Sequence, residues 1–344
     1  MNRKHFITTL APLALSATTV SAFAQQKKIT TNPKNTQPVI PPYLKPGDTI
    51  GITCPAGSLL NTELAPAQKK LEEWGYNVLV GSTVGTKYGT FAATDTERAA
   101  DFNAMLTNPK VKAILCGRGG YGCNRIIDML QLTQLTKTPK WVIGFSDVTL
   151  LHTHINTQLG MASLHSKMCN SFITDYTKAE PAQIESIESI NQCLTGQPVC
   201  YTNATHNNNR LGSAKAILVG GNLSIICSAI GTKSALNTAG KILFLEDVSE
   251  YLYNLDRMLR TLHRSGMLAG LKGLIIGGFK HKPTEKPEEE FAETIIDIVT
   301  NLTKNYNYPI CFAFNVGHQR ANYALQCGVV HTLAVASTSV TLSN

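Results

Sequence analysis

The sequence lacks the cysteine and histidine patterns of a metalloprotein or a disulfide-stapled domain. It contains nine cysteines, an odd number, with no Cys-x-x-Cys pair and no Cys/His cluster at zinc-site spacing. Cys116, Cys227 and Cys311 lie in apolar runs, as small buried residues do. Cys193 and Cys200 are near enough along the chain for a local disulfide, which nothing else in the sequence requires. We therefore predict no metal site and no disulfide framework.

The sequence also lacks a long basic run. It has 31 Lys and Arg against 23 Asp and Glu, a formal net charge of +8, and these cations are scattered. No nucleic-acid partner is predicted from such a distribution. A mild positive field suits an anionic small substrate or the cell envelope. At 344 residues, with 43% hydrophobic and 16% charged residues, the chain is long and apolar enough for two domains.

The apolar run near the N-terminus, residues 6–15, is short for a membrane span and is interrupted by Pro12. Basic residues precede it, and small residues follow at 22–24, where a signal peptidase reads them. No cysteine occupies the cleavage site, so a lipoprotein is not predicted. We predict a signal peptide over 1–24, no integral membrane span after its cleavage, and an exported, periplasmic protein. A retained anchor is the alternative.

Beyond a polar linker at 25–40, strand and helix patterns alternate along the chain. Such alternation predicts an α/β fold, with a parallel sheet covered by helices on both faces. The predicted strands are 49–54, 77–80, 111–116 and 141–143, and the predicted helices are 62–75, 95–106 and 124–130.

A change in composition divides the rest of the chain. Residues 41–174 form a predicted N-terminal nucleophile domain, polar residues 175–210 an interdomain connection, and residues 211–344 a C-terminal domain. The last of these mixes strands with fewer helices, which predicts a smaller α+β domain of barrel-like character. No internal repeat is evident. The predicted C-terminal elements are strands at 241–245, 271–277 and 310–314, helices at 252–262 and 291–302, and a β-rich tail at 324–342.

The stretch 141–149 (WVIGFSDVT) has the pattern of a buried strand that turns sharply into a helix. A serine at such a corner, here Ser146, is exposed at the carboxyl end of the sheet and close to backbone N–H groups. A nucleophilic serine needs that placement, since its hydroxyl must be fixed near oxyanion donors. Taken alone, the motif favours a simpler role for Ser146, as a helix cap.

Two further polar residues follow predicted strands. Glu246 comes after the strand 241–245, and His318 comes after an apolar stretch that ends at Val316. Each alone is typical of a solvated strand end, but together with Ser146 they supply a nucleophile, a base and an orienting carboxylate. The chain order is that of α/β-hydrolases, whose Gly-x-Ser-x-Gly elbow is however not matched here.

Six short motifs, in order, resemble the LD-carboxypeptidase family of serine peptidases, which includes the microcin-immunity peptidases. The resemblance runs from about residue 40 to the C-terminus. The motifs are LKPGD (44–48), RGGYG (118–122), GFSDVT (144–149), GGNL (220–223), LED (245–247) and GH (317–318).

The resemblance implies a flavodoxin-like N-terminal domain, a smaller swivelling-barrel-like C-terminal domain and a homodimer. It also implies hydrolysis of the bond between an L-centre and the terminal D-alanine of murein tetrapeptides or muropeptides. Matching positions suggest Ser146 as nucleophile, His318 as general base and acid, and Glu246 as the residue that orients the imidazole. Neither a metal nor an organic cofactor is required.

Backbone and polar groups around this triad are candidate substrate contacts. The N–H of Asp147 is the expected first oxyanion donor, and Gly119 or Gly120 the expected second, because bare backbone can approach closely. Arg118 is expected to pair with a substrate carboxylate or in a structural ion pair. Asn222 is expected to contact substrate or to serve as a turn asparagine.

The chain departs from the family where HSKM (165–168) replaces a frequent His-Gly-Pro-Met stretch. Lys167 therefore stands in place of proline and could alter one wall of the pocket. Export is a second departure, because many relatives act in cytoplasmic murein recycling.

Three alternatives remain open. The nearest is a microcin-immunity-type peptidase or amidase that cleaves acyl-sulfamoyl adenylates. Residues 117–122 also satisfy G-x-G-x-x-G, so a dinucleotide-binding protein with Asp147 on the ribose is a more remote alternative. The third is a non-catalytic muropeptide binder, which the presence of all three triad residue types disfavours.

Overall fold

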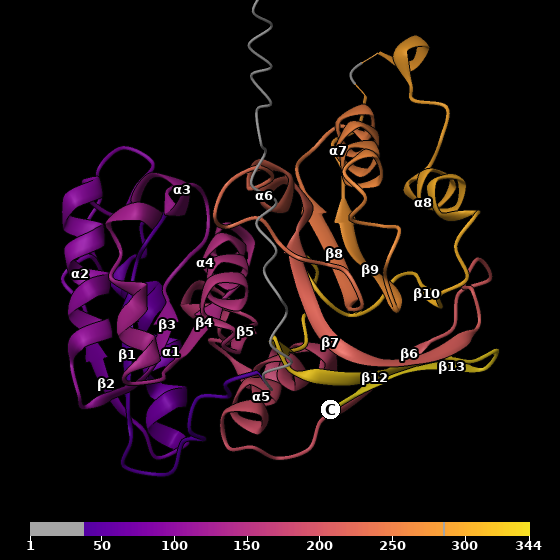
Figure 1. Ribbon diagram of the computed structural model, residues 1–344. Helices are drawn as coiled ribbons and strands as arrows, with labels where there is room; N and C mark the ends of the chain where they lie inside the picture. The colour runs from indigo at the N-terminus through magenta and orange to yellow at the C-terminus, as the bar shows by residue number, and fades with distance from the viewer. Residues whose placement is uncertain (1–37, 285) are drawn as a thin grey trace, which may run out of the picture. The chain divides into compact units, whose positions relative to one another are not determined.

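A computed structural model describes residues 38–284 and 286–344, which belong to one compact unit, Gln37–Asn344. The predicted signal peptide and nearly all of the predicted linker lie outside the described residues. Within this unit the strands form two sheets, one of six strands and one of seven (Figure 1).

The six-stranded sheet carries the predicted nucleophile corner at Ser146 and has the order β2-β1-β3-β4-β5-β11. Strands β1 to β5 are parallel, and β11 closes the edge antiparallel to β5. The parallel order 2-1-3-4-5 is that of flavodoxin-like folds, so the predicted N-terminal architecture is confirmed. The strands are β1 (Thr49–Thr53), β2 (Asn77–Val80), β3 (Val111–Cys116), β4 (Trp141–Gly144), β5 (Ser163–His165) and β11 (Leu325–Cys327).

Helices cover both faces of this sheet. Alternate residues of β3 enter different cores: Leu115 packs with α1, whereas Ile114 packs with α2. A strand buried on both faces is apolar almost throughout, which is why the sequence shows continuous rather than alternating apolar runs. The helices are α1 (Asn61–Glu73), α2 (Asp95–Thr107), α3 (Cys123–Ile126) and α4 (Thr149–His154).

The seven-stranded sheet is mixed, with the order β10-β9-β8-β7-β12-β13-β6. Strands β7 to β10 run parallel, while β12, β13 and β6 are antiparallel. The strands are β6 (Cys200–Ala204), β7 (Gly212–Asn222), β8 (Ile242–Val248), β9 (Gly273–Lys280), β10 (Ile310–Cys311), β12 (Val330–Val335) and β13 (Ser339–Ser343).

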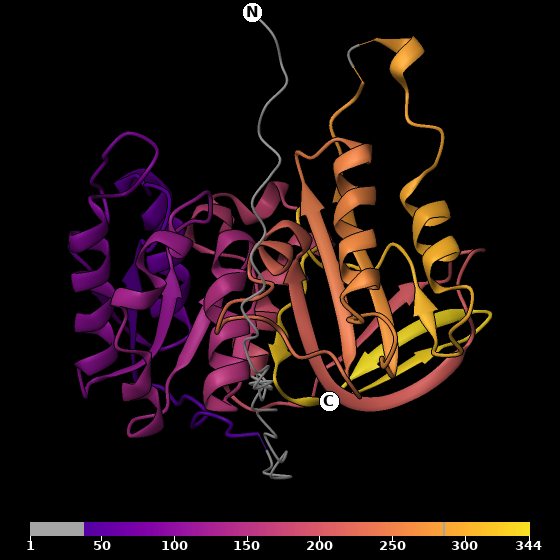
Figure 2. The same ribbon diagram turned by 45° about the horizontal axis from the view of Figure 1, so that its top comes forward.

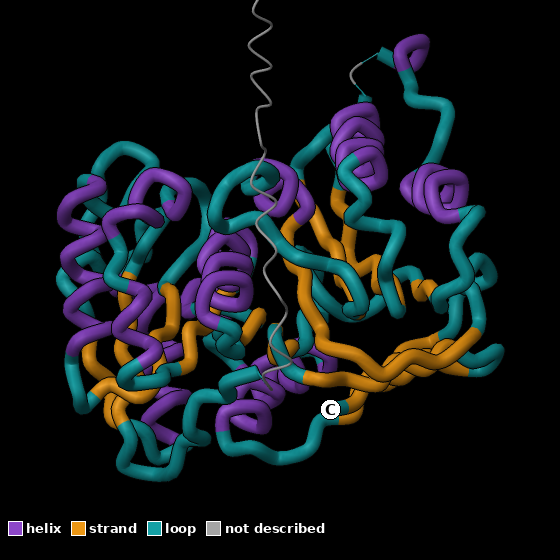
Figure 3. Tube along the Cα trace, in the orientation of Figure 1, coloured by secondary structure: helices purple, strands orange, loops and turns teal. Residues whose placement is uncertain are grey.

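The long strand β7 joins the two halves of this sheet. Residues 212–217 pair with β12 and residues 218–222 pair with β8, and Figure 2 shows β7 as one long curved strand. Helices pack on the parallel half (Figure 3), in agreement with the predicted α+β architecture. These are α6 (Leu223–Ser228), α7 (Leu252–Arg264) and α8 (Ile295–Thr303).

The predicted connection 175–210 contains a helix that its polar composition did not predict. Helix α5 (Pro181–Leu194) begins with a capping box at Glu180 and with proline in its first turn. Its residues Ile187 and Ile190 are buried in the same hydrophobic core as Leu115 and α1. Its apolar residues are separated by serines and glutamates, which give the stretch the composition of a polar connection.

The chain returns once to the first sheet. After β10 it supplies β11 to that sheet, and then it continues into β12 of the second sheet. The predicted domain ranges are consecutive in sequence, so they do not describe this return of the chain. Strand β11 belongs to the first sheet but lies within the range predicted as the C-terminal domain.

The nine cysteines are all free, including Cys193, which is buried, and Cys200, which is exposed. Between residues 38 and 344, leaving out residue 285, no helix is long and apolar enough to cross a bilayer.

Candidate active site

Ser146 lies at a strained corner between β4 and α4. It is half-buried and has a φ of 61°, a left-handed conformation that non-glycine residues rarely adopt. Val148 precedes α4 as its N-cap residue, and no side chain caps that helix. The helix-cap interpretation of Ser146 is therefore wrong. The corner instead presents its side chain at the carboxyl end of the parallel sheet, where the strand-to-helix pattern predicted it.

The glycine-rich loop after β3 packs directly on this corner. A Cβ at Gly119 would lie 2.9 Å from Ser146 Cβ and 3.1 Å from its Oγ, so any larger residue would crowd the hydroxyl. The Gly57 N–H donates to the Gly119 carbonyl at 2.9 Å and fixes the loop from the other side. Gly120 has a φ of 101°, which favours glycine. The loop backbone thus lies beside the serine.

The Asp147 side chain ties the corner to the same loop region. Its Oδ2 accepts a 2.7 Å hydrogen bond from the Cys123 N–H, and the residue is almost fully buried. Burial raises the pKa of this carboxyl above its usual range, although the hydrogen bond opposes the shift. The carboxylate is therefore structural, which leaves the backbone N–H of Asp147 as the expected oxyanion donor.

Glu246 and His318 form a hydrogen-bonded pair. His318 Nδ1 lies 2.5 Å from Glu246 Oε2, and Glu246 is fully buried while 19% of the His318 side chain is exposed. The sequence predicted that Glu246 follows a strand ending at residue 245. In the structure β8 extends to Val248, so Glu246 lies inside the strand. With Nδ1 bonded to the carboxylate, the imidazole carries its proton there and leaves Nε2 as an acceptor.

His318 approaches the nucleophile corner through Phe145, the residue before Ser146. The two ring centroids are 4.8 Å apart. No hydrogen bond joins Ser146 Oγ to His318 in the part of the chain that the structure describes. His318 is thus held by the Glu246 carboxylate and lies against Phe145, and no bond between Ser146 and His318 is present among the described residues.

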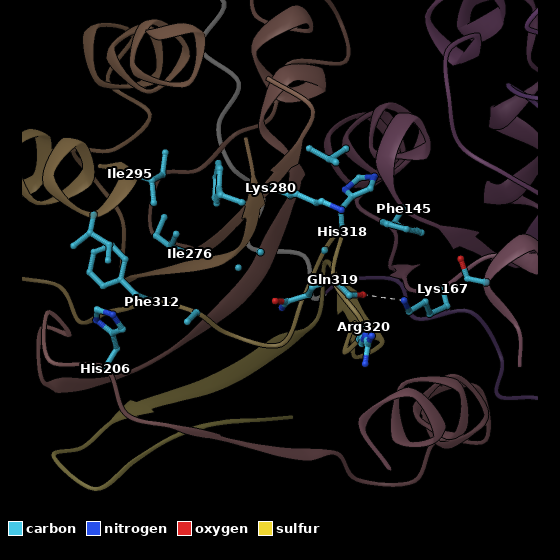
Figure 4. Close-up of a pocket in the computed structure, with 18 of the residues that line it drawn as sticks. Phe145, Lys167, His206, Ile276, Lys280, Ile295, Phe312, His318, Gln319 and Arg320 are labelled. Carbon is cyan, nitrogen blue, oxygen red and sulfur yellow. Dashed lines mark hydrogen bonds between the residues drawn. The ribbon is translucent and has the colours of Figure 1, made fainter. Parts of the chain in front are cut away.

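A cleft of about 910 Å³ opens beside His318 (Figure 4). Phe145 and Lys167 from the first half of the chain line it together with His318 and Gln319. Apolar side chains such as Ile276 and Phe312 line it farther from His318. Within residues 38–284 and 286–344, no group of three or more His, Cys, Asp or Glu side chains is placed to hold a metal ion.

Comparison with known proteins identifies the family. Residues 50–166 match the model of the LD-carboxypeptidase N-terminal domain, and residues 215–333 match that of the LD-carboxypeptidase C-terminal domain. This chain belongs to the LD-carboxypeptidase family. It is 32% identical over 295 residues to the probable murein peptide carboxypeptidase of Bacillus subtilis, covering 84% of this chain and 89% of that protein.

Solved structures agree with this assignment. The muramoyltetrapeptide carboxypeptidase of Oxalobacter formigenes is 26% identical, with a TM-score of 0.75, and the match covers 86% of this chain and 98% of that one. The microcin C7 self-immunity protein MccF, in complex with aspartyl sulfamoyl adenosine, is 20% identical with a TM-score of 0.77, over 89% of this chain and 99% of that one. The two-domain α/β fold expected from the resemblance is confirmed.

In this LD-carboxypeptidase-family chain, Asn222 links the end of β7 to the start of α4, close to the Ser146 corner. Its N–H donates to Thr149 Oγ1 at 3.0 Å, and its buried carboxamide oxygen caps α6 by accepting from the Ile225 N–H at 3.2 Å. The carboxamide nitrogen reaches Asp247 Oδ1 at 3.4 Å. Both ends of the side chain are therefore hydrogen-bonded within the protein, with Asn222 as the N-cap residue of α6.

Arg118 is occupied in a similar way. Its guanidinium lies 3.2 Å from Glu63 Oε1, and 46% of its side chain is exposed. The structure thus contains the ion pair that was the expected alternative to a substrate contact. An exposed pair of this kind contributes little stability, so a stronger anion could replace Glu63.

His165 is a site-adjacent residue whose environment the sequence did not reveal. It is fully buried between Phe145 and Phe244, with ring-centroid distances of 5.8 and 5.0 Å. Burial holds its pKa well below the usual range, so it is neutral and supports the aromatic residue under His318. Its position in HSKM was visible in sequence, but its packing depends on β8 from the second sheet.

Proposed function

We propose that this protein is a serine-type LD-carboxypeptidase that hydrolyses the bond between an L-centre and the terminal D-alanine of murein tetrapeptides. The observation that carries the proposal is the His318–Glu246 pair beside the strained Ser146 corner, in a chain of this family. The names of the relatives in Bacillus subtilis and Oxalobacter formigenes support a murein peptide as the substrate class.

In the proposed reaction, Ser146 Oγ attacks the scissile carbonyl while His318 Nε2 takes its proton. The imidazolium then protonates the leaving D-alanine nitrogen, and a water repeats the sequence on the acyl-enzyme. Glu246 stabilises the imidazolium and keeps the proton on Nδ1 in the resting state. The 2.5 Å contact between His318 and Glu246 supports this role. The proposed reaction uses no metal or organic cofactor.

The negative charge on the tetrahedral intermediate requires backbone donors. The Asp147 N–H, with that of Gly119 or Gly120, is the proposed oxyanion site. The contact of Gly119 with the Ser146 side chain supports it, because that contact puts bare backbone beside the attacking oxygen.

We further propose that the bond between Ser146 and His318 forms when substrate enters. Catalytic hydrogen bonds often tighten only in the substrate complex, and here Ser146 follows β4 of one sheet whereas His318 lies in the loop after β10 of the other. The Phe145–His318 contact supports a short remaining movement, since the rings already touch.

A microcin-immunity-type peptidase or amidase is the second candidate, favoured by the shared fold with MccF. The dinucleotide-binding alternative loses support, because its ribose ligand Asp147 is buried and bonded to Cys123. We also propose an exported, periplasmic homodimer, on the N-terminal sequence pattern for export and on the family resemblance for the dimer.

The proposed function is tested by incubating the purified mature protein with disaccharide tetrapeptide and following D-alanine release by mass spectrometry. Ser146→Ala should reduce release by several orders of magnitude. Ser265→Ala, an exposed serine at the C-terminal end of α7, serves as the matched control. Equal D-alanine release by Ser146→Ala and the wild type would show that Ser146 is not the nucleophile. If neither protein released D-alanine, the amidase or a non-catalytic binder would be favoured.

A further inference from the structure

Lys167 is an ammonium group without a carboxylate partner at the wall of the active-site cleft. It is half-buried, and its Nζ donates one hydrogen bond, to the Gln319 carbonyl at 3.0 Å (Figure 4). A lysine ammonium has three N–H donors. In the described chain, Lys167 forms no ion pair, and the two other donors have no protein acceptor. The group is therefore held in place while most of its binding capacity is unused.

The surroundings of Lys167 favour an anion. The basic residues that line the cleft include Lys167, Lys280, His318 and Arg320. Its described lining contains no aspartate and no glutamate. Arg320 is already paired with Glu180, and Lys280 is exposed. Lys167 is thus the most enclosed unpaired cation of the cleft, and an anion that entered would meet it with little competition.

Burial lowers the pKa of Lys167 below its usual range, because the ammonium has lost water without gaining an opposite charge. A bound carboxylate would supply that charge and reverse the effect. In a partly dehydrated cleft such a charge-assisted bond is stronger than on the open surface.

We infer that Lys167 binds the C-terminal carboxylate of the peptide substrate. The inference rests on the proposed function, which places a leaving D-amino acid beside His318. In that amino acid the carboxylate is separated from the leaving nitrogen by a single carbon. Lys167 is bonded to the carbonyl of Gln319, the residue after His318, and both Lys167 and His318 line the same cleft, so a substrate bound at His318 lies in the cleft that holds the cation.

In this role Lys167 would determine which peptides are hydrolysed, and it would take no part in bond breaking. A carboxypeptidase must distinguish a chain end from an internal peptide bond, and a fixed cation does so by favouring substrates with a free terminal carboxylate. An internal peptide would leave the ammonium enclosed and unpaired, which is unfavourable.

The test compares a murein tetrapeptide with its C-terminal carboxamide. In wild-type protein, kcat/KM should favour the free acid, and Lys167→Met should lower kcat/KM for the acid about 10- to 100-fold, mainly through KM. The carboxamide should be almost unaffected, so the preference for the acid should disappear. Lys167→Arg should restore most of the preference. Lys272→Met, at an exposed lysine of the second half of the chain, is the matched control and should behave as wild type.

Binding to Ser146→Ala protein, measured by calorimetry with the same two peptides, separates this inference from the proposed function. Preference for the acid that is lost in Ser146→Ala/Lys167→Met would uphold the carboxylate site even if wild-type protein released no D-alanine. Equal affinities for acid and carboxamide would overturn it. The inference would also be overturned if Lys167→Met lowered the affinity for both peptides equally. In that case Lys167 would only hold the Gln319 backbone in place. A loss that follows amidation of a side-chain carboxylate instead of the terminal one would also overturn it.

Discussion

Gly317 allows the His318–Glu246 pair to form by having no side chain. A Cβ at this position would lie 2.4 Å from Glu246 Cβ, and the φ of 101° is one that side chains rarely adopt. The residue before His318 therefore packs directly on Glu246, the hydrogen-bond partner of that histidine. The Glu246 side chain thus fills the space that a side chain at position 317 would need.

We expect Gly317→Ala to separate this pair. The added methyl must displace the loop or Glu246, and a displacement of about 1 Å costs on the order of 100-fold in kcat. The strained φ adds about 1–3 kcal/mol of destabilisation. Steady-state kinetics and urea unfolding measure the two effects.

Gly266→Ala is the control for backbone strain, because Gly266 has a φ of 78° but a methyl group there would meet no other atom within 4 Å. It should lose stability while keeping kcat. A Gly317→Ala protein with normal kcat would show that this contact does not position His318.

Residue types and strand ends were enough to predict Ser146, Glu246 and His318 as candidates. Their side-chain environments were not predictable, because those depend on contacts between segments far apart in sequence. The Asn222 carboxamide is occupied by a helix cap and by Asp247, and no spacing rule reveals that choice. The positive φ of Ser146 and the close approach of Gly119 to its side chain are likewise not readable from spacing.

At the scale of elements, α5 is hydrogen-bonded to the segment that carries His318, the proposed base. Ser186 Oγ accepts the Asn322 N–H at 2.8 Å, and Asn322 Oδ1 accepts the Gly317 N–H at 2.8 Å. These two hydrogen bonds run from the helix to the residue before His318. Both serine and asparagine are buried, so the bonds are shielded from water.

We expect Ser186→Ala to reduce the free energy of unfolding by about 1–3 kcal/mol, because the buried Asn322 N–H loses its acceptor. It should also lower kcat more than it raises KM, because the loop that holds His318 loosens. Chemical denaturation and kinetics test both effects, with Ser265→Ala as the exposed control. Reduced stability with unchanged kcat would mean that α5 supports the fold but not the base.

The sequence predicted the parallel sheet better than it predicted α5. Strands buried on both faces have long apolar runs, which are easily recognised. In α5, Ser186 and Ser189 occupy buried positions because they accept backbone N–H groups from 322 and 324. A serine at a core position weakens the apolar periodicity, and the partner that makes it favourable lies far away in the sequence.

At the scale of the whole molecule, buried neutral histidines make stability depend on pH. Burial lowers the pKa of His152 and of His331 to about 4, from an ordinary value of 6.5. The unfolded chain therefore binds more protons than the folded chain between those two values. Stability is fully present above pH 6.5 and is lost as pH falls toward 4.

We expect each of these histidines to cost about 2 kcal/mol of stability between pH 7 and pH 5. In His331→Leu, urea unfolding should show a smaller loss over this interval by about that amount. Between pH 7 and pH 8 the variant and the wild type should change almost equally, because both histidines are then largely neutral in the folded and in the unfolded chain. The same loss in both proteins from pH 7 to pH 5 would show that His331 is not responsible.

Strand β11 has a consequence for how the chain reaches its native state. The edge of β5 stays open until residues 325–327 arrive, so the first sheet cannot be completed by the first half of the chain alone. An N-terminal fragment would expose that edge, which invites pairing with other chains. Synthesis and any export must therefore deliver almost the whole polypeptide before the sheet can close. Ser146 precedes β11 and His318 lies just before it, so the proposed nucleophile and base would come together only when nearly the whole chain is present.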